Sequence, residues 1–294
     1  MTQRHHGVDC HPGVDRAAEF IFSAAHAPAA SMKHQLQALF GLSVAEKAGT
    51  PGAVARVDAM AARVSGTLDR ERENGRFDPF AHDVKLLLLC HDVLRRRGTE
   101  SAALASFVRE TSDALRGMEP VPARLTGLAH LLDAMGEGPF TMSETSGWTD
   151  GDPLPSGTSL LLADSHTVRR LCNAIAAYTL FGSREMPGRH PDLLLTLPVL
   201  VLQKLREYDL ILGSTLLRAL SYLGADDSET FDFAARYLGC QQQDDGRFGF
   251  YARELAEGPI LRTADQDLFL PVAVSALWAL AEVSVPGLQV VERL

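Results

Sequence analysis

The sequence is poor in aromatic residues, which make up 7% of its 294 residues, and it has no excess of basic side chains. Its 28 Lys and Arg residues are outnumbered by 37 Asp and Glu residues, which gives a formal net charge of −9. A nucleic-acid-binding domain usually carries a basic excess, so we do not expect nucleic acid as the main partner. Hydrophobic residues make up 46% and charged residues 22%, a balance typical of a globular chain.

Long apolar runs and paired cysteines are also missing. The longest uncharged stretch is 268–281, which is shorter than the roughly 20 apolar residues of a membrane-spanning helix, so no membrane span is expected. No apolar signal segment precedes Asp15. The four cysteines form no C-x-x-C pair and are expected to be reduced thiols. These absences predict a cytoplasmic protein.

Apolar residues instead recur at helical spacing over most of the chain. In 82–97, Val84, Leu87 and Leu88 share one face, and three arginines precede Gly98, where cations complement the helix dipole and glycine ends the helix. The other segments of this kind are 101–117, 123–136, 166–182, 196–224, 228–243 and 268–283. No hairpin signal interrupts them. The pattern predicts one all-α domain over 1–294, built from antiparallel helix pairs with short connections.

One segment breaks this rhythm. Residues 136–158 are rich in Gly, Pro, Ser and Thr and contain Trp148. We expect a long flexible connection here, and both a lid over a site and a plain linker fit such a segment.

A local pattern occurs twice. Ala-Ala-Arg at 61–63 is followed by Asn-Gly-Arg-Phe at 74–77, and the same tripeptide at 234–236 is followed by Asp-Gly-Arg-Phe at 245–248. An acidic residue then leads an apolar helix in each copy, Asp83 in the first. Repeated helix pairs predict a solenoid or a closed α/α arrangement in which Phe77 and Phe248 occupy equivalent places.

The second copy resembles a known motif. Residues 237–248, YLGCQQQDDGRF, resemble the QW-type repeat of terpenoid cyclases and protein prenyltransferases, with an aromatic-Leu pair, Gln242 four positions after Leu238, and Gly246-x-Phe248. The resemblance implies an α/α toroid in which this motif supports architecture, not catalysis. The chain is also similar to uncharacterised helical proteins of actinobacteria that accompany natural-product biosynthesis genes, a likeness that implies no established activity.

The same resemblance bears on Asp265-Gln266-Asp267. In cyclases that protonate an alkene, the middle Asp of an Asp-x-Asp-Asp motif is the general acid, and this sequence looks like a truncated form with Leu268 in place of the last Asp. Such an acid must be held protonated in a dry pocket. The alternative is that Asp267 caps a helix whose first turn contains Pro271.

Other polar residues lead apolar helices in a similar way. His82 and Asp83 precede one helix, and His190 and Asp192 precede another. If these helix starts meet at one mouth, the groups can carry out acid–base chemistry or bind a metal; if they do not, they are polar helix starts that face water.

Three residues are candidates for substrate binding. His166 and Tyr178 lie about three helical turns apart and so share a face, either lining a cavity or packing in the core. Trp148, in the predicted loop, is the third.

The motifs of several enzyme classes are absent, including Asp-Asp-x-x-Asp, phosphate-binding glycine loops, Gly-x-Ser-x-Gly and His-Glu-x-x-His. We therefore expect no metal and no cofactor. The favoured hypothesis is a tailoring or cyclase-like enzyme of specialised metabolism that acts by acid–base chemistry on a small apolar or peptide-derived substrate. The alternatives are a non-catalytic helical-repeat module that binds a peptide or protein, and a protein that sequesters a small molecule without turnover.

Overall fold

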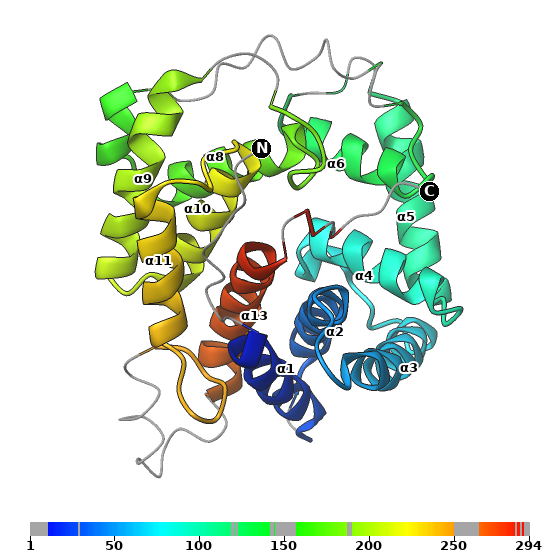
Figure 1. Cartoon of the computed structure of the whole chain (residues 1–294). Helices are drawn as coiled ribbons and strands as arrows, with labels where there is room; N and C mark the ends of the chain where they lie inside the picture. The colour runs from blue at the N-terminus through cyan, green and yellow to red at the C-terminus, as the bar shows by residue number, and fades with distance from the viewer. Residues whose placement is uncertain are drawn as a thin grey trace.

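The computed structural model describes residues 11–28, 30–118, 121, 123–141, 144, 157–186, 190–249, 265–285, 287–288 and 290, and these confirm the all-α prediction (Figure 1). The α-helices are α1 (His11–His26), α2 (Met32–Lys47), α3 (Ala53–Glu73), α4 (Val84–Arg96), α5 (Ala102–Arg116), α6 (Ala123–Ala134), α8 (Ser165–Tyr178), α9 (Pro191–Arg206), α10 (Leu210–Tyr222), α11 (Glu229–Cys240) and α13 (Asp265–Ser284). Two 3₁₀-helices are η1 (Pro79–Ala81) and η3 (Gly157–Leu162). In this part of the chain, β pairing is limited to an isolated bridge between Gln242 and Phe248.

Local chemistry explains where the helices begin. The carboxylates of Asp83, Asp164 and Asp209 accept hydrogen bonds from backbone N–H groups in the first turns of α4, α8 and α10. The hydroxyl of Ser228 does the same for α11, as its position before an acidic first turn predicts. These caps satisfy N–H groups that have no partner within the helix.

The predicted helical stretch 196–224 is divided between α9 and α10. Tyr208 adopts a φ of 59° in the connection, and Asp209 then caps the new helix. A left-handed residue cannot continue a right-handed helix, so the chain reverses here and α10 packs along α9. The apolar pattern runs through both helices and gives no sign of this break.

Six helices form a closed circuit, in which each helix contacts the next and the last contacts the first. The order of contact is α13, α2, α4, α6, α8, α10 and again α13. In Figure 1 they surround the middle of the molecule, and the other helices pack around them: α1 on α13 and α2, α3 on α2, α5 on α4, and α9 and α11 on α10.

Helix α13 is the most apolar element of this arrangement. By length and composition, 267–284 is the one candidate membrane span in the described part of the chain. Core helices meet the same test, and 56% of this segment is buried inside the protein, where it contacts α1, α2, α10 and α11. These contacts account for its composition as a core helix.

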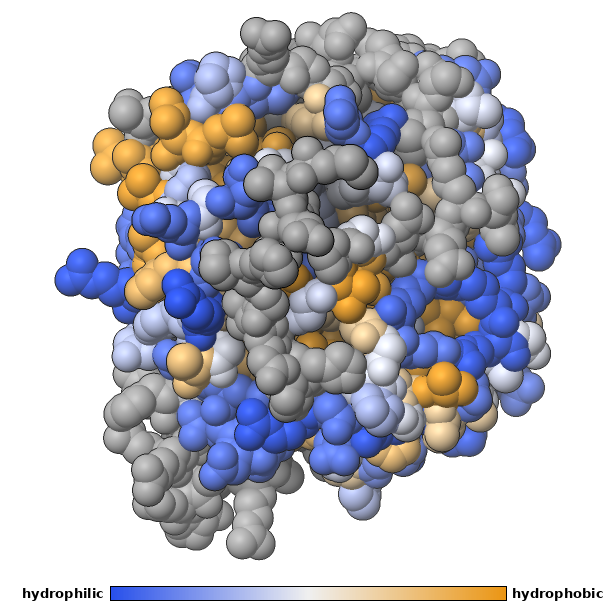
Figure 2. Space-filling view, in the orientation of Figure 1, coloured by the Kyte–Doolittle hydropathy of each residue, from blue (hydrophilic) through white to orange (hydrophobic). Residues whose placement is uncertain are grey.

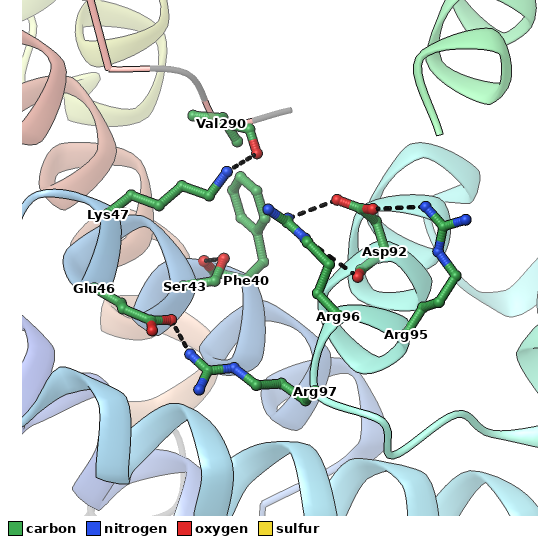
Figure 3. A network of polar contacts seen from close by, with 9 residues as sticks. All are labelled: Phe40, Ser43, Glu46, Lys47, Asp92, Arg95, Arg96, Arg97 and Val290. Atoms are coloured by element: carbon green, nitrogen blue, oxygen red, sulfur yellow. Dashed lines mark hydrogen bonds and ion pairs between the residues drawn. The ribbon is translucent and has the colours of Figure 1, made fainter. Parts of the chain in front are cut away.

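The arginines at the end of α4 are held by carboxylates (Figure 3). Arg96 lies 2.6 Å from the buried carboxylate of Asp92, and Arg95 lies 3.4 Å from it. Arg97 pairs with Glu46 near the end of α2. The arginines were expected to complement the helix dipole, and the Arg97–Glu46 pair additionally ties α4 to α2.

The two copies of the repeated pattern lie in comparable places. One follows α3 and leads to α4, and the other follows α11 and precedes α13. Phe248 is 1% exposed, and Phe77 packs partly buried against the same core. The amide of Gln242 reaches the start of α1, where Nε2 donates to the Gly13 carbonyl at 2.7 Å. This contact gives the glutamine of the second copy a structural role.

The glycines of the two copies provide a matched test of this packing. A Cβ at Gly246 would lie 2.1 Å from the Arg16 carbonyl oxygen, whereas one at Gly75 would meet nothing within 4 Å. Both glycines have positive φ, 89° and 67°. Gly75→Ala should therefore cost only the left-handed backbone strain, roughly 1 kcal/mol. Gly246→Ala should cost about 3 kcal/mol or more, because α1 must also move. Urea unfolding measures both, and equal losses would contradict this packing.

Candidate functional site

A cavity of about 420 Å³ lies among the six mutually contacting helices, and we call it the central pocket. Its apolar lining includes Phe40, Leu86, Leu89, Leu131, Phe181 and Trp278. Its polar lining includes Gln37, Asp83, Lys85, Arg169, Asn173, Thr215, Arg218 and Ser275. A mainly apolar cavity with a few charged groups is the usual form of a small-molecule site.

Lys85 lines the central pocket from the first turn of α4. Burial lowers the pKa of its ammonium group, and the nearby carboxylate of Asp83 partly offsets this effect. The Nζ atom lies 4.0 Å from the point where a Cβ on Gly127 would stand. That Cβ would also lie 2.6 Å from the Cβ of Ala177, so glycine permits the close approach of α6 and α8 beside the lysine. A lowered pKa leaves more of this amine neutral and able to accept a proton.

Arg218 and Trp278 lie against each other in the wall of the central pocket. The guanidinium carbon of Arg218 lies 3.2 Å from the centre of the Trp278 ring, so the cation stacks on the indole. Phe40 meets the same indole edge-on, with ring centres 4.7 Å apart. Arg218 is 7% exposed. The rings therefore hold a nearly buried cation in a fixed orientation at the pocket wall.

Glu282 lies behind this pair. Its Oε1 accepts hydrogen bonds from the Tyr222 hydroxyl at 2.7 Å and the Trp278 indole at 2.6 Å. Its Oε2 lies 3.7 Å from Nε of Arg218 and accepts no hydrogen bond. Burial raises the pKa of the carboxyl to about 7, although Arg218, Tyr222 and Trp278 all act in the opposite direction. This group can therefore change charge near neutral pH.

Asp83 is the predicted catalytic residue that reaches the central pocket. It caps α4 by accepting the N–H of Leu86 at 3.0 Å, and it is exposed at the pocket lining. His82 precedes it and is partly buried, with a pKa lowered by burial and an Nδ1 that has no hydrogen-bond partner. It is not among the residues that line the pocket.

Asp267 contacts a histidine that the sequence did not single out. Its Oδ1 accepts a hydrogen bond of 2.8 Å from Nε2 of His34, whose Nδ1 accepts the N–H of Ser31. The Asp267 side chain is 72% exposed, so it is not held in a dry pocket. The alternative prediction, that Asp267 caps a helix with Pro271 in its first turn, is wrong. Helix α13 begins two residues earlier, at Asp265, and Pro271 lies inside it. Only the helical backbone of Asp265 is described.

The remaining predicted residues lie elsewhere. Asp192 is exposed in the first turn of α9, and His190 lines a second hollow of about 860 Å³ together with Tyr222. His166 is exposed in the first turn of α8, whereas Tyr178 is buried at its end. Trp148 and most of the predicted loop 136–158 lie outside the described residues. The predicted carboxylates and histidines whose side chains the structure describes therefore do not line one pocket.

Sequence reasoning missed the charged groups of the pocket wall. Lys85, Arg218 and Glu282 each interrupt an apolar stretch of their helix, and a charge within such a stretch is the signal that marks a buried ion. Among the described side chains, no group of three or more His, Cys, Asp or Glu is placed to hold a metal.

Comparisons with known proteins add no relative to this picture. No protein-family model matches the chain, and neither the curated proteins nor the solved structures include a significant match.

The raised pKa of Glu282 should make stability depend on pH. Between pH 4.5 and about 7 this carboxyl binds more protons in the folded protein than in the unfolded chain, so its contribution to stability falls as pH rises through this window. Glu282→Gln should remove a fall on the order of 2 kcal/mol. Urea unfolding at pH 5 and pH 8 measures the difference, with exposed Glu73→Gln as the control. An identical pH dependence in the wild type and Glu282→Gln would contradict the assignment.

The amine of Lys85 should react at lower pH than an ordinary lysine. Because burial lowers its pKa, acetylation by an N-hydroxysuccinimide ester should reach its half-maximal rate at a lower pH than in a short lysine peptide. Peptide mass spectrometry follows Lys85 separately. The pH at half-maximum, and not the absolute rate, is decisive, since burial also slows access. A profile equal to that of the peptide would refute the lowered pKa.

Proposed function

We propose that this protein is a small-molecule enzyme of the tailoring or cyclase-like kind, which acts on a small apolar or peptide-derived substrate in the central pocket by acid–base chemistry. The observation that carries the proposal is the pocket itself. It lies among six helices, has about 420 Å³ of space and is mainly apolar, yet its lining contains the anionic side chain of Asp83, which caps α4, and the cationic side chain of Lys85 in the first turn of that helix.

We further propose that the helices form an α/α toroid. The circuit of contacts from α13 through α2, α4, α6, α8 and α10 supports an inner ring, and the packing of the other helices supports an outer one. The positions of Phe77 and Phe248, each after an outer helix and before an inner one, support equivalent repeat units. A ring of this kind places its pocket at the centre, where residues distant in sequence meet.

The acid–base pair that the pocket favours is Lys85 with Asp83. The amine can take a proton from a bound substrate because its pKa is lowered, and the carboxylate, two residues earlier, stabilises the ammonium that results. The apolar part of the lining would shield the part of the bound molecule that it contacts from water. The His34–Asp267 contact joins the first turns of α2 and α13, about one helical turn before Gln37 and Pro271 of the lining, and so holds these two pocket helices together.

One observation favours a second candidate function, the binding of a protein or peptide partner. Helix α9 exposes Leu194, Leu195, Val199 and Leu202, and Leu195 is 75% exposed. Figure 2 shows hydrophobic surface at the upper left, where α9 lies in Figure 1. Exposed apolar patches are typical of interaction surfaces. If this face is the functional site, Leu195→Glu should abolish partner capture while small-molecule binding to the pocket stays unchanged.

Narrowing the central pocket tests the first proposal. Asn173 is a polar side chain of α8 at the lining, so Asn173→Trp should fill space without removing a core residue. We expect it to weaken the binding of decan-1-ol, a simple apolar probe, at least tenfold in isothermal titration calorimetry. Arg170→Trp adds the same ring to the same helix at a position that is equally exposed but does not line the pocket, and it should change the affinity less than twofold.

Failure of decan-1-ol to bind the wild type, or unchanged binding to Asn173→Trp, would contradict the pocket as the site. Native mass spectrometry of the purified wild type then looks for a retained small molecule. Conversion of that molecule by fresh protein supports an enzyme, and its unchanged recovery supports sequestration without turnover.

A further inference from the structure

We propose that the ligand of the central pocket carries a carboxylate or phosphate group on an apolar body, and that the guanidinium group of Arg218 binds this anion. The inference rests on the proposed function, because it requires that the pocket take a small molecule. It adds the chemical class of that molecule and the residue that selects it.

The geometry of Arg218 supports an anion site. Its Nε is committed to the protein, where it donates to the Tyr222 hydroxyl at 3.3 Å and lies 3.7 Å from Glu282. No hydrogen bond joins its two Nη atoms to any residue that the structure describes. The guanidinium lines the pocket, is 7% exposed and is fixed in orientation by stacking on Trp278. Two free donors in a fixed plane match the paired oxygens of a carboxylate or phosphate.

The charges around the pocket favour the same class of ligand. Lys85, Arg169 and Arg218 line it, and among the lining residues that the structure describes Asp83 is the one carboxylate. Glu282 lies behind Arg218 and does not line the pocket, and its Oε1 is occupied by other donors. The lining therefore has an excess of positive charge, and an anion that reaches Arg218 gains both hydrogen bonds and the field of the neighbouring cations.

The rest of the lining fits an apolar body. Phe40, Leu89, Leu131 and Phe181 provide hydrocarbon surface. The volume of about 420 Å³ is within the range of pockets that enclose a small organic molecule. A ligand with one charged end and an apolar remainder matches both parts of the site.

Matched probes test the inference. Decanoate, decyl phosphate and decan-1-ol share one chain and differ in the head group. At pH 8, isothermal titration calorimetry of the wild type should show at least one anion binding tenfold or more tightly than the alcohol, and the comparison of the two anions shows whether the site prefers carboxylate or phosphate. Arg218→Gln should remove the preference and leave decan-1-ol affinity within twofold. Arg236→Gln, which removes a positive charge from an exposed position of α11 outside the pocket lining, should leave the preference in place.

A second variant is expected to bind the anion more tightly, and a damaged fold cannot produce such a gain in affinity. At pH 8 most of Glu282 is ionised, because its pKa is about 7, and it then neutralises part of the Arg218 charge. Within the described part of the chain, the titratable and charged groups that face Glu282 are Arg218 and Tyr222, both on α10. Glu282→Gln should therefore increase affinity for the preferred anion at least threefold and leave decan-1-ol unchanged.

The outcomes separate the two proposals. If decan-1-ol binds in the pocket but neither anion binds more tightly, or if the preference survives Arg218→Gln, the anion site is refuted and the pocket function stands. If Arg218→Gln does not fold, unchanged anion affinity in Glu282→Gln refutes the anion site. If no probe binds the wild type, both proposals fail.

Discussion

The structure depends on how one carboxyl group, that of Glu282, is accommodated inside the protein. It lies near the end of the most apolar helix, where an isolated charge would be costly. Tyr222 and Trp278 donate hydrogen bonds to it, and Arg218 supplies a nearby cation. Because Arg218 and Tyr222 belong to α10, the carboxyl also fixes how α10 and α13 pack. Removal of one partner would leave the others buried without compensation, so the four groups act as a unit.

This unit also determines what lies at the centre of the protein. Arg218 and Trp278 face the central pocket, and Tyr222 lines the second hollow. The contacts that join α10 to α13 are therefore the same contacts that form the wall between two cavities. The charge of this wall is set by groups that hold the helices together, which explains why stability and ligand preference are expected to respond to the same substitution at Glu282.

Much of the helical architecture follows from the sequence, and the reasons are local. The spacing of Leu87 and Leu88 and the capping carboxylate of Asp83 are enough to predict α4. The break at Tyr208 could not be predicted, since the apolar pattern continues across it and its left-handed backbone has no glycine to mark it. The start of α13 at Asp265 was also missed, because Pro271 was expected to lie in the first turn.

The candidate site was harder to predict than the fold. Asp83 was identified because it directly precedes an apolar helix, and the start of such a helix can be recognised from the sequence alone. Arg218 and Glu282 stand within helices, and their roles depend on packing between α10 and α13 that the order of residues does not show. The motif near Gln242 points to architecture, and the structure gives its amide a contact with α1. A pattern within a segment thus predicts local roles better than it predicts a pocket made by six segments.

The contact between His34 and Asp267 joins residues 233 positions apart. During synthesis, α1 and α2 leave the ribosome long before the helix that covers their apolar faces exists. Pairings this distant in sequence slow folding and leave early intermediates open to aggregation. The nascent chain is therefore expected to need either a chaperone or transient packing among its first helices until α13 is available to cover them.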